Sequence, residues 1–280
     1  MNYILLAFSC FCNSMKSVFA KKSNAFLNEM HTVYTYNFYM FFVAFLIALP
    51  RGITQINATS FPTIALAVFY GTAMVFGQTF LIKAMEIGEV SVSTLFYSCG
   101  FLIPTFVSVF VYNENLKLLQ VVGVVLILIS FLISTEKFEN SGRKWFSFAI
   151  LSFFSNGLIG LSQKIFRMSA YKGEQNVFLA ISFLVGAIVA FFMMPKNFKV
   201  PPSRGFLQTV IGSGAMLGLV NVINVHVSGL LPGIIVFPVV NGGSIIVSAI
   251  LARILVKEKL TFRKKLGITI GVIAICLIAI

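Results

Sequence analysis

The stretch that decides the fold runs from Pro62 to Met85 and reads PTIALAVFYGTAMVFGQTFLIKAM. It contains a single charged residue, Lys83, which lies close to its end. A helix of about 20 mainly apolar residues crosses the hydrocarbon core of a bilayer, where only helices or closed barrels satisfy their backbone hydrogen bonds. Because the run is continuously apolar rather than alternating, it predicts a transmembrane helix and not a barrel strand.

Comparable stretches occur along the whole chain. Of the 280 residues, 58% are hydrophobic and 10% are charged, which leaves too little polar surface to cover a soluble fold. The sequence therefore predicts an all-α membrane protein with ten transmembrane helices. The expected spans are Asn2–Ala20, Val33–Leu49, Pro62–Met85, Val90–Tyr112, Leu116–Ser134, Trp145–Phe166, Asn176–Met194, Gly205–Val227, Leu231–Leu255 and Thr261–Ile280.

The balance of charge is strongly basic. The 21 Lys and Arg residues outnumber eight acidic residues, all of them Glu, and the net charge is +13. In a soluble domain this excess would indicate nucleic acid as a partner. Here the basic residues cluster in short gaps between apolar runs, as in loops that face the anionic lipids of a membrane. We therefore expect a bilayer with anionic lipids as a partner, and no nucleic acid.

Other function classes lack their motifs. There is no Gly-rich phosphate loop ending in Lys and Ser or Thr, so the chain is not itself an ATP-driven pump. No nucleophile elbow points to an enzyme. The four cysteines lie inside apolar runs and imply neither disulfides nor a metal site, so we expect no cofactor and no bound metal. The first apolar run carries Asn13 and Lys16 and has no preceding positive charge, which indicates a retained span rather than a cleaved signal.

The chain also contains an internal repeat. A shift of 143 residues lays three polar residues of the first span on three of the sixth: Ser9, Asn13 and Lys21 on Ser152, Asn156 and Lys164. A shift of 144 residues lays Glu114, Leu116 and Gly123 on Glu258, Leu260 and Gly267. One register from end to end predicts two five-helix repeats, residues 1–134 and 145–280, joined by a polar loop at residues 135–144. Because five is odd, the second repeat enters the membrane inverted, an arrangement typical of transporters.

A motif closes the fourth and ninth spans. Residues 101–116 read FLIPTFVSVFVYNENL and residues 248–260 read SAILARILVKEKL, each ending in Glu-x-Leu before a Gly-bearing helix. This pattern resembles the EamA-like branch of the drug/metabolite transporter superfamily, whose two five-helix repeats each carry such a turn. The resemblance covers essentially the whole chain. It implies carrier-type movement of a small metabolite, often outward, without naming the solute.

Polar side chains inside membrane spans are costly, so they usually face a packed interior or a wet cavity. In the first span, Ser9, Asn13 and Lys16 recur at helical spacing, and the sixth span carries a related stripe. We expect the two stripes to face each other across a central cavity; the alternative is interhelical hydrogen bonding without a ligand. The candidate substrate-binding residues are Asn13, Lys16, Tyr70, Gln78, Tyr97, Ser98, Asn156, Gln163, Asn221, Asn224, His226, Asn241 and Ser244.

Two features of these candidates bear on mechanism. Lys16 favours a substrate with a carboxylate or phosphate if its ammonium stays in the cavity, and carries no such meaning if it snorkels toward Lys21. All eight Glu residues lie in loops or at helix ends, so a mid-membrane carboxylate for a proton relay is missing. The related small multidrug pumps use a Glu in their first helix, and this chain has Asn13 and Lys16 there. The coupling ion, proton or sodium, stays open.

The ninth span departs from the fourth. It has Ser248 where the fourth span has Pro104, and it carries Pro238 followed by the Asn-Gly-Gly-Ser stretch at residues 241–244. Small residues and an amide suit a helix that unwinds to offer carbonyls to a ligand, and they also suit close helix packing.

The leading functional hypothesis is a secondary active transporter, an exporter or exchanger, of a small polar metabolite such as an amino acid or other organic solute. The rivals are a flippase for a lipid-linked solute and a non-transporting membrane subunit or receptor. We expect a multi-pass protein of the plasma or inner membrane, monomeric or homodimeric. The basic residues concentrate in the odd-numbered connections, which places both termini outside, whereas the family resemblance favours cytoplasmic termini.

Overall fold

The computed structural model describes residues 2–23, 30–54, 59–87, 90–115, 117–134, 142–194, 204–255 and 261–279, and this part of the chain is helical without strands. The helices of the first half are α1 (Asn2–Ser23), α2 (Met30–Ile53), α3 (Phe61–Ile87), α4 (Val90–Cys99), α5 (Leu102–Phe110) and α6 (Leu118–Ser134). Those of the second are α7 (Gly142–Met168), the short 3₁₀ helix η3 (Lys172–Glu174), α8 (Gln175–Phe192), α9 (Arg204–Val227), α10 (Gly233–Leu255) and α11 (Phe262–Ala279).

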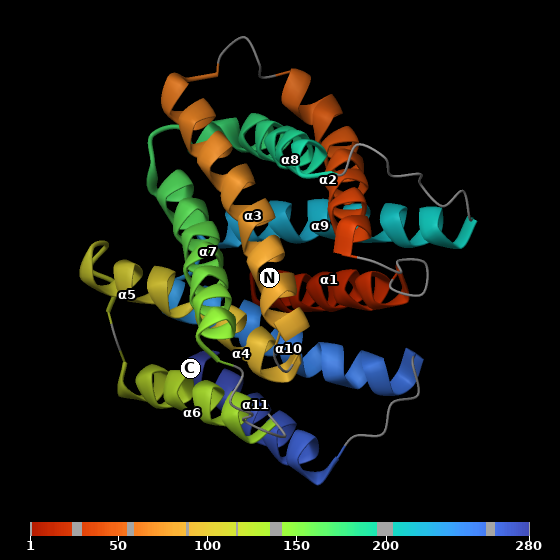
Figure 1. The fold of residues 1–280 in the computed structure, drawn as a ribbon. Coiled ribbons are helices and arrows are strands. Elements are labelled where there is room, and N and C mark those ends of the chain that lie inside the picture. The colour runs from red at the N-terminus through yellow and green to blue at the C-terminus, as the bar shows by residue number, and fades with distance from the viewer. Residues whose placement is uncertain are drawn as a thin grey trace.

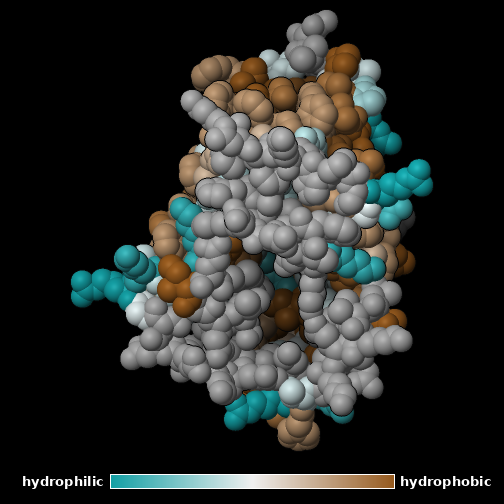
Figure 2. All heavy atoms as spheres, turned by 45° about the vertical axis from the view of Figure 1, so that its right-hand side comes forward, coloured by the Kyte–Doolittle hydropathy of each residue, from teal (hydrophilic) through white to brown (hydrophobic). Residues whose placement is uncertain are grey.

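Several of these helices are built for a bilayer. Among the described residues, five segments are long and apolar enough to cross a membrane: Tyr34–Ile53, Phe61–Ala84, Gly142–Met168, Lys172–Phe192 and Arg204–Val227. The fourth, fifth, ninth and tenth predicted spans fall on shorter apolar segments. Large apolar side chains are widely exposed, and Figure 2 shows hydrophobic residues over much of the described surface. The chain is therefore a multi-pass membrane protein.

Helices from the two halves pack against one another. In Figure 1, α1 lies beside α10, and α6 lies beside α11 at the opposite edge from α8. The helix α1 packs on α9 and α10, while α7 packs on α3, α4 and α5. The helices α2 and α8 pack on each other, α2 also contacts α9, and α8 also contacts α3. Every helix of the first half thus has its main partner in the second.

Close packing at glycines recurs at the same spacing in both halves. A Cβ added to Gly71 would meet the Ser182 carbonyl oxygen, and one added to Gly214, 143 residues later, would meet that of Met40. These contacts join α3 to α8 and α9 to α2. Glycine lets two helix backbones approach where no side chain could fit between them.

A second glycine pair shows the same relation. A Cβ added to Gly100 would lie 2.5 Å from the Phe153 carbonyl oxygen, and one added to Gly243 would lie 2.7 Å from Cys10 Sγ. Gly243 follows Gly100 by 143 residues, as Phe153 follows Cys10. The contacts therefore fasten the chain between α4 and α5 to α7, and α10 to α1.

The fourth predicted span is not one continuous helix. It divides into α4 and α5, with a break at Gly100 and Phe101. Pro104 has no N–H to donate to the Gly100 carbonyl, which instead accepts from the Ile103 N–H at 3.1 Å. The ninth span, by contrast, stays helical through Pro238 and the glycines that follow. In α10 the small residues serve close packing, and the helix does not unwind there.

Two predicted connections are described only in part. Of the polar loop at residues 135–144, the described portion begins at Gly142, which is already the first residue of α7. The Glu-x-Leu turn at Glu258 lies outside the described residues.

The glycine contacts predict a difference between two residues one turn apart in α9. In Gly214→Ala the new Cβ would lie 2.6 Å from Val43 Cβ and 2.8 Å from the Met40 carbonyl oxygen. Overpacking of this kind costs about 1–3 kcal/mol, so we expect a lower melting temperature of the purified protein in detergent. In Gly218→Ala the nearest atom, Ile47 Cγ2, lies 4.0 Å away, so this variant should be unchanged or gain about 0.5–1 kcal/mol of helix propensity.

The comparison requires both variants to be purified as monodisperse protein and unfolded under the same conditions. Equal melting temperatures for the two variants would contradict the packing described for α2 and α9.

Candidate functional site

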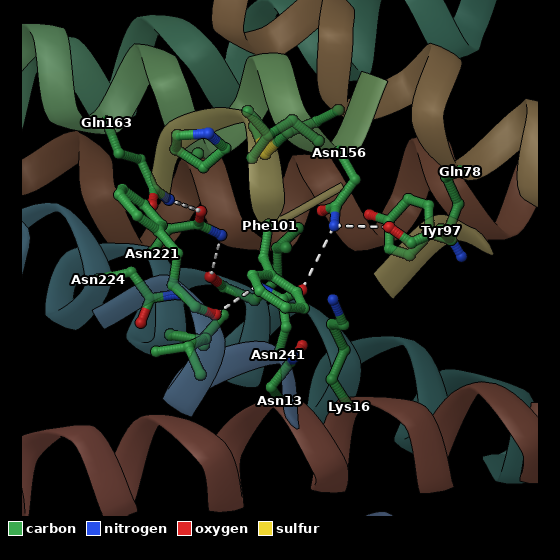
Figure 3. Close-up of a pocket in the computed structure, with 18 of the residues that line it drawn as sticks. Asn13, Lys16, Gln78, Tyr97, Phe101, Asn156, Gln163, Asn221, Asn224 and Asn241 are labelled. Carbon is green, nitrogen blue, oxygen red and sulfur yellow. Dashed lines mark hydrogen bonds between the residues drawn. The ribbon is translucent and has the colours of Figure 1, made fainter. Parts of the chain in front are cut away.

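A cavity of about 130 Å³ lies where the two halves of the chain meet. Its walls come from α1 to α5 in the first half and from α7, α9 and α10 in the second. Figure 3 shows amide and other polar side chains pointing into this space from opposite sides. The volume accommodates more than one water molecule, and the mixed polar and apolar lining is typical of a small-molecule site.

Most of the predicted cavity residues line this space. They are Asn13, Lys16, Gln78, Tyr97, Asn156, Gln163, Asn221, Asn224 and Asn241. Four others lie elsewhere. Tyr70 is fully buried behind the wall, Ser98 is buried in α4, Ser244 is buried beneath Asn13, and His226 is exposed on the surface of α9.

One end of the cavity is lined by amides that are bonded to one another. Gln163 Nε2 donates to the Tyr70 hydroxyl oxygen at 2.7 Å and to Asn221 Oδ1 at 3.4 Å. The Tyr70 hydroxyl donates to Asn221 Oδ1, and Asn221 Nδ2 donates to the Leu217 carbonyl at 2.8 Å. Three helices, α3, α7 and α9, thus share one buried hydrogen-bonded cluster, which fixes the rotamers of its members.

The repeat-related asparagines Asn13 and Asn156 occupy the middle of the cavity. Asn13 Nδ2 donates to Ser244 Oγ on α10 at 3.0 Å. Asn156 Nδ2 donates to the Tyr97 carbonyl at 2.9 Å and to Asn241 Oδ1 at 3.3 Å. The Tyr97 carbonyl lies at the break between α4 and α5, so Asn156 supplies a donor where the regular helix bond is lost. Both asparagines therefore hold helices together as well as face the cavity.

The other end of the cavity has free polar groups. Lys16, Gln78 and Tyr97 line it, and the side chains of all three lack hydrogen-bond and ion-pair partners among the described residues. Figure 3 shows Lys16 rising from α1 into the space on the same side as Gln78 and Tyr97. The ammonium of Lys16 therefore stays in the cavity and does not pair with another part of the described chain.

Sequence reasoning missed the apolar walls and one ion pair. Phe41, Phe101 and Phe237 line the cavity among other apolar residues, and apolar residues in apolar spans carry no distinguishing pattern. The ion pair joins Lys164 at the end of α7 to Glu114 after α5. A usable signal existed, because both residues fall at the ends of spans that the predicted topology brings to the same membrane side.

Glu114 forms the centre of a buried network. Its Oε1 pairs with Lys164 Nζ, its Oε2 accepts from the Gly233 N–H, and Lys164 Nζ also donates to the Ser228 carbonyl at 3.2 Å. The side chains of Lys164 and Glu114 are 3% and 14% exposed. Asn113, with φ of 51°, forms the turn that aims Glu114 inward.

The network lies just beyond one end of the cavity. Lys164 follows the lining residue Gln163 directly, and Gly233 lies one turn before the lining residue Phe237 on α10. A Cβ on Gly233 would collide with Ser108 Oγ, so α5 and α10 touch there. The ion pair and this contact together close the cavity at the end where its bonded amides lie.

The chemistry of the site is that of binding. Its polar lining consists of neutral amides, one tyrosine and one lysine, without an acidic side chain. Within the described ranges there is also no group of three His, Cys, Asp or Glu residues that could hold a metal ion. Hydrogen-bond donors and acceptors spread over several helices suit recognition of a small polar molecule.

Comparisons with known proteins bear on both the fold and the family. No curated protein shows significant similarity to the chain. A solved structure, titled "Crystal structure of protein", superposes with a TM-score of 0.76 at 11% identity, covering 98% of this chain and 94% of its own. That likeness shows the fold for both halves. The model of the EamA-like transporter family matches residues 1–135. The first half of the chain therefore belongs to the EamA-like transporters of the drug/metabolite type.

Proposed function

We propose that this protein is a secondary active transporter that carries a small polar metabolite through the central cavity. The observation that supports this most is the position of the cavity, which lies between the two halves and takes polar side chains from both. A site between two repeats, near the middle of the spans, is the arrangement that lets a carrier expose one site alternately to two sides.

We further propose that the halves are inverted repeats related by an axis through the cavity. Residues 143 positions apart line it in pairs: Asn13 with Asn156, Lys16 with Ile159, Met74 with Leu217, Gln78 with Asn221, and Tyr97 with Val240. The paired glycine contacts and the exchange of helix partners between halves support the same relation. An odd number of spans in each half then gives the two copies opposite orientations.

The lining also bears on the driving force. A proton-coupled cation pump needs a carboxylate at the site, and no acidic side chain lines this cavity. The chain also lacks an ATP-binding loop. We therefore favour export or exchange driven by the gradient of a solute, as carried by related drug/metabolite transporters.

The Glu114 network is proposed to be a gate. Alternating access requires one side of the site to be shut while the other opens, and a buried ion pair with backbone hydrogen bonds is a discrete contact that forms or breaks as a unit. By the bias of basic residues toward the odd-numbered connections, the end closed by Glu114 faces outward in a plasma or inner membrane. A reporter fused after Ile280 tests that orientation.

Transport itself is tested with purified protein in proteoliposomes. We expect uptake of at least one solute from a panel of labelled amino acids and other small organic solutes, above the uptake of protein-free vesicles. A flippase would instead move a fluorescent lipid-linked solute between leaflets. A protein that moves neither class would contradict the proposal and favour a subunit or receptor role.

The gate is tested by labelling. With the native cysteines replaced, a cysteine at Val236, which lines the cavity near Gly233, is exposed to a membrane-impermeant thiol reagent added from the Glu114 side. We expect Glu114→Ala to raise the labelling rate several-fold, because Lys164 and Gly233 lose their common partner. The matched control is Glu174→Ala, since Glu174 also accepts a backbone N–H, that of Ser60 at 3.0 Å, but lies outside the cavity lining.

Removing one partner of a buried pair leaves the other charge uncompensated, which costs about 3–5 kcal/mol. The neutral double variant Glu114→Gln with Lys164→Met avoids that cost and should also label faster than the parent. Unchanged labelling in this double variant would contradict the gate.

A further inference from the structure

We propose that the cavity recognises its solute through a carboxylate, held by Lys16 together with Gln78 and Tyr97. This inference rests on the proposed function, since it names the class of substrate for the same cavity. It is carried by one observation above all: the only cationic side chain that lines the cavity is the one without an anionic partner in the described chain.

The two lysines near the cavity show the contrast. Lys164 has both an ion pair with Glu114 and a hydrogen bond to a backbone carbonyl. Lys16 has neither among the described residues, and no acidic side chain lines the cavity into which it points. A charge within membrane-spanning helices is costly unless it meets an opposite charge or water. A bound anion would supply the missing partner.

The neighbours of Lys16 fit an anion as well. Lysine offers only donors, the Tyr97 hydroxyl offers one donor, and the Gln78 amide offers two. None of these groups is used in a hydrogen bond within the described chain. Three free donors on one side of a cavity match the acceptor oxygens of a carboxylate, which takes about four hydrogen bonds.

The count of charges selects among anions. The cavity supplies one unit of positive charge, and arginine, whose planar fork suits phosphate, does not line it. A single carboxylate balances the charge, whereas a phosphate dianion would leave an excess in a largely closed space.

The opposite end of the cavity suits an uncharged polar group. Gln163 and Asn221 are bonded to each other and to Tyr70. Asn224 accepts from Ser9 at its Oδ1, which leaves its Nδ2 as a donor toward the cavity. The solute class is therefore a small monocarboxylate with a neutral, hydrogen-bonding far end.

The experiment uses matched pairs of probes. Proteoliposomes with the full-length protein are offered an equimolar set of small hydroxy- and amino-carboxylates, with the primary amide of each and with inorganic phosphate, and uptake is measured by mass spectrometry. Binding of the same compounds is measured separately by thermal stabilisation of the purified protein. The variants are Lys16→Met and, as a control on the same helix, Lys22→Met, because Lys22 is exposed.

We expect wild type and Lys22→Met to take up at least one carboxylate and to discriminate against its amide. Lys16→Met should lose that uptake and stabilisation by about tenfold or more while remaining folded, as expected for loss of a charge-assisted hydrogen bond. Uptake limited to amides or phosphate, or unchanged carboxylate uptake by Lys16→Met, would overturn the inference and leave the proposed function standing. Stabilisation by carboxylates through Lys16 without any uptake would support the site and overturn the transport function. Neither binding nor uptake of any probe would overturn both.

Discussion

Contact between helix backbones at glycines is the interaction on which the rest of this structure depends. In lipid, apolar side chains gain little by leaving their surroundings, so helices associate through close packing and hydrogen bonds. Gly71 and Gly214 bring α3 against α8 and α9 against α2, and Gly100 and Gly243 fasten the central helices. These contacts are tight at the periphery of the cavity. The space they enclose is lined by longer residues that do not fill it, and so a cavity remains.

The polar groups around that space divide into two kinds with different physical consequences. Tyr70, Gln163 and Asn221 satisfy one another, so they form a rigid wall whose cost of burial is largely offset by their own hydrogen bonds. Lys16 and Gln78 are not satisfied by the described chain. Groups of this second kind are tolerable only in the presence of water or a ligand. The first kind gives the site its shape, and the second gives it its affinity.

The sequence was sufficient for what periodicity and composition control. Membrane helices, the repeat and the inward position of Asn13, Lys16 and Asn156 followed from apolar runs and a polar stripe at helical spacing. Tertiary geometry decided the rest. His226 and Asn224 lie two residues apart on α9 and therefore about 200° apart around the helix, and only packing shows that Asn224 faces the cavity. The pairing of Glu114 with Lys164, and the break caused by Pro104 and occupied by Asn156, likewise required knowledge of which spans are neighbours.

A scaffold of two similar halves raises the question of how a solute is held in one orientation. Where the lining pairs match, as at Asn13 with Asn156, the cavity offers the same chemistry to both ends. The pair formed by Lys16 and Ile159 breaks this symmetry, because one half supplies a cation where the other supplies an apolar side chain. Tyr97 with Val240 breaks it in the same sense, since the hydroxyl lies on the side of Lys16. The electrostatic field inside the cavity therefore has a direction that the fold alone would not give it. Duplication accounts for the central position of the site, and the differences between the copies account for its selectivity.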